Sequence, residues 1–211
     1  MNRDIERLQG ISTTARTNPD LLTSEDVTFV TKSLQSSNEK VVAQAYATVG
    51  QIGINRSELI SHLVDRVFSA LKDKNGDVRE QALLALGTIG RSDITAVSNR
   101  LDKILQMHCD PQPKVRGAML IACQSIVHAS AVIFKPFIGL FERMLDDPDE
   151  DLVQKSAIKT LRTIGKYEPE IVERSLVLLR GKLRNPSQTI QAQAVDAIRI
   201  IETYLRRTPT V

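Results

Sequence analysis

The residues of this sequence that could carry acid–base or metal chemistry are few and widely spaced. The three histidines are His62, His108 and His128, and none has a partner at the spacing of a metal site. Cys109 and Cys123 lack the spacing of a metal or disulfide motif, so we expect reduced thiols packed in helices. The sequence therefore predicts no catalytic residue, no metal ligand and no cofactor.

An acidic run, DDPDED at 146–151, offers the oxygen ligands that calcium prefers. It lacks the glycine and the ligand spacing of an EF-hand loop. The other interpretation, which we favour, is a solvated turn whose carboxylates stabilise the N-terminus of the following helix through its dipole.

Four cations form a group of positive charge at helical spacing. Lys155, Lys159, Arg162 and Lys166 follow at steps of four, three and four residues, so on a helix they share one face. Like charges at this spacing repel each other. The stripe predicts either an anionic partner or a solvated lysine-rich face.

The element that must position these side chains is a helix that recurs about every 37 residues. Val41, Val78, Val115, Val153 and Ile190 anchor five copies. Small or apolar residues follow each anchor at offsets +4, +7 and +11, as Ala82, Ala85 and Ile89 follow Val78. At about 100° per residue these offsets lie on one helix face, where small residues let a neighbouring helix come close.

A second apolar-periodic segment precedes each anchored helix. These leading segments cover approximately 24–35, 57–72, 93–108, 131–146 and 169–184. Ser24 and Ser57 are candidate N-caps, and Pro136 predicts that the fourth segment starts or kinks there. Gly53, Gly90 and Gly165 are expected to end three anchored helices. No segment indicates a strand.

The repeating unit is therefore a helix pair, which can bury its apolar surface only by stacking on other pairs. The pattern resembles the HEAT-repeat family. Two stretches carry the resemblance, LKDKNGDVREQALLALGTIG with Asp73 and Arg79, and DPQPKVRGAMLIA with Asp110 and Arg116. The resemblance implies a ladder of hydrogen bonds between these four residues of neighbouring repeats.

Other repeats depart from that ladder. Val42, Gln154 and Gln191 replace the arginine, and Ser36 and Asn185 replace the aspartate. A ladder is therefore expected only between the second and third repeats.

We predict an all-α, right-handed α-solenoid of about five HEAT-like helix pairs after an N-terminal capping helix. It is expected to be a single domain, 1–211. Its predicted parts are the cap at 1–20 and repeats at 21–55, 56–92, 93–129, 130–167 and 168–207. We expect the apolar positions Leu8, Ile11 and Ala15 of the cap to face the stack and its polar residues to cover the exposed end; the alternative is a frayed terminal helix.

Offsets +2, +6, +9 and +13 of the anchored helices point away from the predicted core face. In the first three helices they are mostly small or apolar, including Gly50, Gly87 and Gly117, and in the fourth they are the four cations. We predict that a partner lies along these second helices. The predicted contact residues are Leu84, Arg91, Ile121, Gln124, His128, Lys155, Lys159, Arg162, Lys166 and Arg199.

The function predicted is a non-catalytic protein-interaction scaffold that binds another protein or an acidic and apolar peptide segment. The alternative is phosphate or nucleic-acid binding through the basic face of repeat four. A net charge of +3 and 4% aromatic residues argue against base stacking. The resemblance implies a third class, because HEAT-like chains include bilin lyase subunits and DNA glycosylases.

Composition gives the expected surroundings. The chain of 211 residues is 42% hydrophobic and 25% charged, which is ordinary for a soluble protein. No apolar run approaches the roughly 20 residues that span a bilayer, so no membrane contact is expected. The start, MNRDIERLQG, has no apolar core of a signal peptide, so we expect a cytoplasmic protein.

Overall fold

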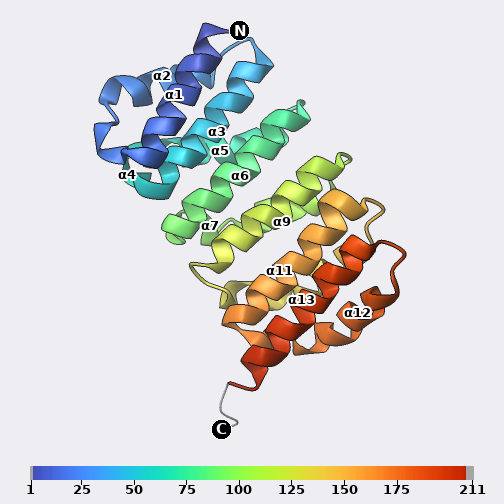
Figure 1. The fold of residues 1–211 in the computed structure, drawn as a ribbon. Coiled ribbons are helices and arrows are strands. Elements are labelled where there is room, and N and C mark those ends of the chain that lie inside the picture. The colour runs from blue at the N-terminus through green and yellow to red at the C-terminus, as the bar shows by residue number, and fades with distance from the viewer. Residues whose placement is uncertain (1, 208–211) are drawn as a thin grey trace. The chain divides into compact units, whose positions relative to one another are not determined.

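The structure is a computed structural model that describes residues 2–207, and within that range it contains helices and no strand (Figure 1). The predicted all-α solenoid of helix pairs is confirmed. The chain divides into two compact units, Met1–Ala129 and Ser130–Val211. This division coincides with the boundary predicted between the third and fourth repeats, and a single domain over 1–211 stays a prediction.

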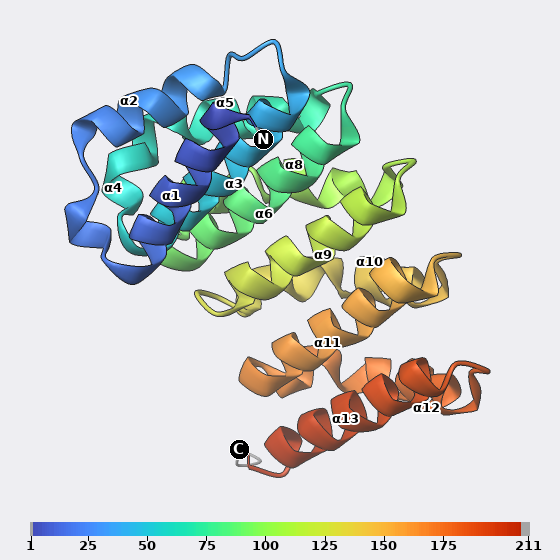
Figure 2. The same cartoon turned by 45° about the horizontal axis from the view of Figure 1, so that its top comes forward.

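Unit 1 contains a capping helix and three helix pairs. The cap is α1 (Arg3–Thr17), and the second helices are α3 (Glu39–Asn55), α6 (Gly76–Ser92) and α9 (Pro113–Val127). These four helices lie side by side in chain order (Figures 1 and 2), and each contacts the next. Broken leading segments cover their other side. They are α2 (Ser24–Ser33), α4 (Ser57–Ile60) with α5 (Val64–Ser69), and α7 (Thr95–Ser98) with α8 (Leu101–Leu105).

Unit 2 contains two helix pairs. Its helices are α10 (Ile138–Arg143), α11 (Lys155–Tyr167), α12 (Leu176–Gly181) and α13 (Gln188–Leu205), and α11 packs on α13. The 3₁₀ segments Val132–Phe137 and Pro169–Ser175 precede α10 and α12, and a π-helical turn, Glu150–Gln154, leads into α11. Pro136 lies inside the 3₁₀ segment, two residues before α10 begins, which fits the predicted start of the helix near this proline.

The core face of the second helices is confirmed. All twenty residues at the anchors and at +4, +7 and +11 are at most 1% exposed. In α1, Leu8, Ile11 and Ala15 are buried against the stack, while Arg3 and Glu6 are exposed, which fits the predicted cap. Among residues 2–207, no helix has the length and hydropathy to span a bilayer.

Three glycines act differently from the prediction. Gly53, Gly90 and Gly165 lie inside α3, α6 and α11, and no described glycine has a positive φ. A Cβ at Gly90 would lie 2.6 Å from Val97 Cγ2, and one at Gly165 would lie 2.5 Å from Ile201 Cγ1. These glycines therefore allow close helix packing and do not end the helices.

The predicted N-caps are also wrong by one residue. Thr23 caps α2, since its hydroxyl accepts the Asp26 N–H at 3.1 Å, and Ser24 is the first helical residue. Ser57 begins α4 after Arg56, whose side chain makes no capping bond. In the first case the threonine and aspartate form a capping box, which outcompetes the neighbouring serine.

Candidate functional site

The loops that precede the second helices share one local hydrogen bond. In each, a side-chain oxygen accepts the backbone N–H two residues later, at 2.8 to 3.2 Å. The acceptors are Ser36, Asp73, Asp110, Asp147 and Asn185. The sequence carries the signal as a short polar residue five or six positions before each anchor. These turns fix where each second helix begins.

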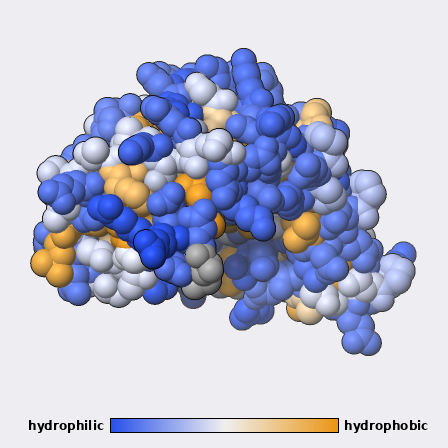
Figure 3. Space-filling model, turned by 90° about the horizontal axis from the view of Figure 1, so that it is seen from above, coloured by the Kyte–Doolittle hydropathy of each residue, from blue (hydrophilic) through white to orange (hydrophobic). Residues whose placement is uncertain are grey.

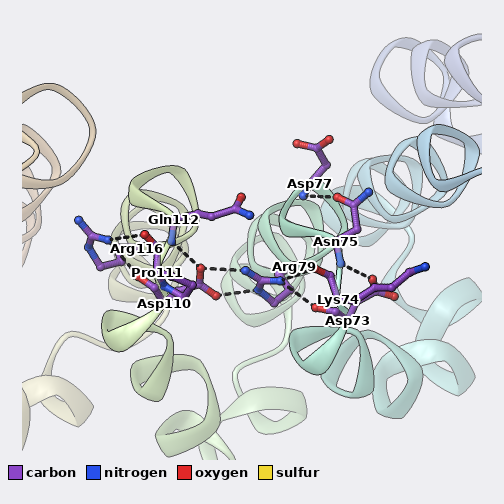
Figure 4. Close-up of polar contacts among 9 residues, drawn as sticks. All are labelled: Asp73, Lys74, Asn75, Asp77, Arg79, Asp110, Pro111, Gln112 and Arg116. Carbon is purple, nitrogen blue, oxygen red and sulfur yellow. Dashed lines mark hydrogen bonds and ion pairs between the residues drawn. The ribbon is translucent and has the colours of Figure 1, made fainter.

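One pair of the predicted ladder, Arg79 of the second repeat and Asp110 of the third, bonds between the repeats (Figure 4). Arg79 Nε donates to Asp110 Oδ2 at 2.7 Å and Arg79 Nη2 donates to Asp110 Oδ1 at 2.9 Å. The two side chains are only 10% and 5% exposed. Burial alone would raise the pKa of Asp110, but the hydrogen bonds from Arg79 and the Gln112 N–H outweigh it and hold that pKa below its ordinary value.

Both ladder arginines also hold their own loops. Arg79 Nη1 donates to the carbonyl of Asp73 at 2.8 Å, and Arg116 Nη1 donates to the carbonyl of Asp110 at 2.9 Å (Figure 4). The glutamines at the departing positions keep this local role. Gln154 Nε2 donates to the carbonyl of Asp147 and Gln191 Nε2 to that of Asn185, each at 2.7 Å.

The predicted contact residues of unit 1 lie on α6 and α9. Ile121 is 44% exposed, Leu84 and Gln124 are half-buried, and Arg91 and His128 are exposed. Leu84 and Ile121 occupy the same offset, +6, on two neighbouring helices.

Three other outward positions do not reach the surface. Gly50, Gly87 and Gly117 are buried, contrary to the prediction. A Cβ at Gly87 would lie 2.6 Å from the Ala122 Cα. The reason is that each second helix has a neighbour along the stack as well as its own leading segment, and these cover offset +9 at Gly50 and Gly87 and offset +2 at Gly117. The apolar surface is therefore narrower than predicted.

The predicted contact residues of unit 2 lie on α11 and α13, and half of the basic stripe is neutralised locally. Lys155 pairs with Asp151, and Arg162 pairs with Asp196. Arg199 Nη2 lies 2.7 Å from the same Asp196, and the hydrogen bonds from Arg199 and Arg162 lower the pKa of that carboxyl. Lys159 and Lys166 are exposed, and Lys166 Nζ lies 5.6 Å from the centroid of the Tyr167 ring.

The residues with potential chemistry are not gathered into one site. Cys109 Sγ lies 3.1 Å from His108 Nε2, a contact between adjacent residues at a helix end. Cys123 is buried and its Sγ lies 3.7 Å from Met119 Sδ, and burial raises the pKa of its thiol. Within residues 2–207, no group of three or more His, Cys, Asp or Glu side chains could hold a metal ion.

The acidic run forms an ordinary helix-entry turn. Asp149 Oδ1 accepts the N–H of Leu152 at 2.8 Å, and Asp147 Oδ1 accepts the N–H of Asp149 at 2.9 Å. Carboxylates used in this way stabilise the helix N-terminus. The geometry supports the solvated-turn interpretation of DDPDED.

No single large apolar area dominates the face seen in Figure 3. Most residues there are hydrophilic, and hydrophobic residues form separate small groups. Isolated apolar residues are normal on a protein surface, so any binding surface must be argued from particular residues.

Comparison with known proteins supports the helical-repeat assignment. The family model described as "Cnd1: non-SMC mitotic condensation complex subunit 1" matches residues 40–201. No curated protein gives a significant match to the chain.

Solved structures share the fold at low sequence identity. An engineered protein from the Northeast Structural Genomics Consortium matches with a TM-score of 0.63 and 16% identity, over 96% of this chain and 98% of that one. A designed armadillo repeat protein in complex with the peptide (KR)4 matches with a TM-score of 0.62 and 16% identity, over 94% and 98%. Computationally designed armadillo repeat proteins for modular peptide recognition match with a TM-score of 0.60 and 17% identity, over 94% and 98%.

Proposed function

The chain belongs to the Cnd1 family, described as non-SMC mitotic condensation complex subunit 1, and from this premise we propose that it is a non-catalytic protein-interaction scaffold. The family description names a subunit of an assembly, so the partner is another protein of such an assembly. The same description supports an intracellular location, which is part of this proposal. The proposed contact is with a segment of that partner.

The observation that carries this proposal is the apolar pair on the second helices of unit 1. Ile121 is 44% exposed and Leu84 is half-buried, so the core of unit 1 covers neither apolar side chain fully. Burying such side chains against a partner removes apolar area from water and supplies affinity. In unit 2, Lys159 and Lys166 give the second helices a positive character that favours an acidic partner segment.

A protein partner is favoured over a phosphate backbone by the local ion pairs. Asp151 and Asp196 neutralise two of the four cations of the stripe, which lowers its attraction for a polyanion. Binding to DNA or RNA would also weaken steeply as salt rises, whereas binding through Leu84 and Ile121 would not. A salt titration of the complex therefore distinguishes the two classes.

The test is a pair of charge substitutions on the intact chain. Leu84→Glu is expected to weaken binding of the partner recovered from cells by about tenfold or more, because it places a charge in an apolar contact. Lys159→Glu is expected to slow association with an acidic segment, to weaken binding and to make binding less sensitive to salt, because it removes an attractive charge.

The matched control is Asp102→Lys on α8, which changes an exposed charge on the leading-segment side of unit 1. All variants should melt like the parent. If Leu84→Glu and Lys159→Glu bind as well as the parent while Asp102→Lys does not, the second-helix surface is not the binding surface.

A further inference from the structure

Helix α12 of unit 2 presents two large apolar side chains to solvent. Val177 is 72% exposed and Leu178 is 45% exposed, which makes Val177 the more exposed of the pair by a wide margin. The helix is a leading segment, so these residues lie apart from the second-helix contact residues discussed above. They need a separate explanation.

Comparison between repeats indicates that core packing does not require Val177. It lies six residues before Leu183, at the position that Asp65 holds before Leu71 and Asp102 holds before His108. Asp65 and Asp102 are both exposed. The position is therefore exposed to water in these repeats, and it is aspartate in the second and third repeats but valine in the fifth.

Two hollows border this apolar pair. One, of about 650 Å³, lies against Pro136 and Ile171, and another, of about 350 Å³, lies against Leu145. Val177 and Leu178 line both hollows. The two hollows share Val177 and Leu178 of α12, and we call the pair of hollows the α12 groove.

Two glycines line the α12 groove at positions where packing would admit a larger residue. A Cβ at Gly139 would come no nearer than 3.8 Å to another residue, and one at Gly181 would meet nothing within 4 Å. Gly181 has φ −57° and ψ −37°, a helical conformation that any residue adopts. Glycine is a poor helix former, and where neither packing nor φ demands it, its bare backbone allows close approach of a ligand. By contrast, Gly165 is held to glycine by Ile201 at 2.5 Å.

The charges that line the groove leave an excess of free cations. Lys135, Arg174 and Arg184 are exposed and form no ion pair within 4.0 Å among the described residues. Their charge is available to a partner.

Two of the acidic side chains are already engaged. Glu142 Oε1 accepts the hydroxyl of Ser175 at 2.7 Å, and Asp146 Oδ1 lies 2.7 Å from Lys182 Nζ. The side chain of Glu170, the third carboxylate of the lining, forms neither a hydrogen bond nor an ion pair in the described part of the chain. The groove therefore combines apolar and charged side chains, and its free cations, Lys135, Arg174 and Arg184, outnumber Glu142 and Glu170, the carboxylates that pair with no cation among the described residues.

We propose that the α12 groove binds an amphipathic peptide segment of another protein, with adjacent bulky apolar side chains flanked by Asp or Glu. The apolar side chains occupy the hollows beside Val177 and Leu178, and the segment's backbone passes over Gly139 and Gly181. Its carboxylates meet Lys135, Arg174 and Arg184. This surface is independent of the second-helix surface and does not rest on its being correct.

The test is selection of an unbiased peptide library displayed on phage against the intact chain, with counter-selection against Val177→Asp. Enriched peptides should carry paired bulky apolar residues with acidic neighbours. In fluorescence anisotropy, Val177→Asp and Gly139→Leu should each weaken such a peptide by about tenfold or more. Exchanging the acidic residues of the peptide for lysine should weaken its binding to the unchanged protein.

Gly10→Leu is the matched control, because Gly10 is an exposed glycine of α1 with nothing within 4 Å of a Cβ. It should leave peptide binding unchanged, and all three variants should keep the parent's melting temperature or exceed it. Basic enriched peptides, no enrichment, or binding that both groove variants leave intact overturns the proposal. A dimer of the chain in sedimentation that Val177→Asp dissolves also overturns it, since the occupant is then a second copy.

Discussion

Arg79 of α6 and Asp110 of the loop before α9 form a bond between two neighbouring repeats. The guanidinium donates two hydrogen bonds to the carboxylate and another to the Asp73 carbonyl. Such bidentate charge-assisted pairs are strong and directional. Because both side chains are mostly buried, removing one partner leaves the other charge without compensation.

Asp110→Asn should therefore destabilise the protein by about 3 kcal/mol at pH 7. The pKa of Asp110 is lowered in the folded state, so its contribution is present above the ordinary aspartate pKa of about 3.9 and is lost as the pH falls through the lower folded value. Urea unfolding of parent and variant at pH 7 and at pH 3 should show a large difference that shrinks in acid.

Asp102→Asn, an exposed aspartate of α8, is the control and should change stability by less than about 0.5 kcal/mol at either pH. A difference for Asp110→Asn that is equally large at both pH values contradicts the assigned role of the ionised carboxylate.

At the scale of the helix, the glycines of the second helices decide how closely neighbours pack. A Cβ at Gly87 would lie 2.6 Å from the Ala122 backbone, whereas one at Gly10 would meet nothing within 4 Å. Both glycines lie in helices. The same substitution should therefore have opposite effects at the two positions.

Gly87→Ala is expected to overpack the contact of α6 with α9 and to cost about 1–3 kcal/mol. Gly10→Ala should stabilise by up to about 1 kcal/mol, because alanine is the better helix former and loses less backbone entropy. Chemical unfolding of the two variants and the parent gives both signs in one experiment. Equal destabilisation by both would show that helix spacing is not set by Gly87.

The sequence predicted the helices well because their signals are local. The spacing of Val78, Ala82, Ala85 and Ile89 follows from the period of the helix alone, and these residues are at most 1% exposed. The paired repeats gave the Arg79–Asp110 bond for the same reason, since neighbouring copies of a repeat bring equivalent positions together.

What the sequence could not give depends on distances between helices. A glycine near a helix end, such as Gly90, has the same pattern whether it ends the helix or admits a neighbour, and only the contact with Val97 separates the two. Local pairing by Asp196 likewise depends on α13 lying beside α11, so the partial neutralisation of the basic stripe could not be foreseen. The sequence alone does not indicate the α12 groove, because Val177 and Leu178 stand in one apolar run with the buried Leu176 and Leu179.

At the scale of the whole molecule, the two units differ in how many helix interfaces they contain. Among residues 2–207, unit 1 has three between its long helices, of α1 with α3, α3 with α6, and α6 with α9. In the same range, unit 2 has one, of α11 with α13. In repeat proteins, stability is approximately the sum of repeat terms, which are often unfavourable alone, and interface terms between neighbours.

Residues 1–129 produced alone should therefore unfold cooperatively and at a higher temperature than residues 130–211 produced alone. In unit 1, α6 is covered on both sides, so Leu83 and Leu86 are fully buried by elements of the same unit. In unit 2, Val195 of α13 is 55% exposed, although it holds the same offset, +5, as the buried Leu83. Far-ultraviolet circular dichroism melts of the two fragments make the comparison. A melt of 130–211 that is as sharp as that of 1–129 and lies at a higher temperature would mean that intrinsic repeat stability, and not the number of interfaces, dominates in this protein.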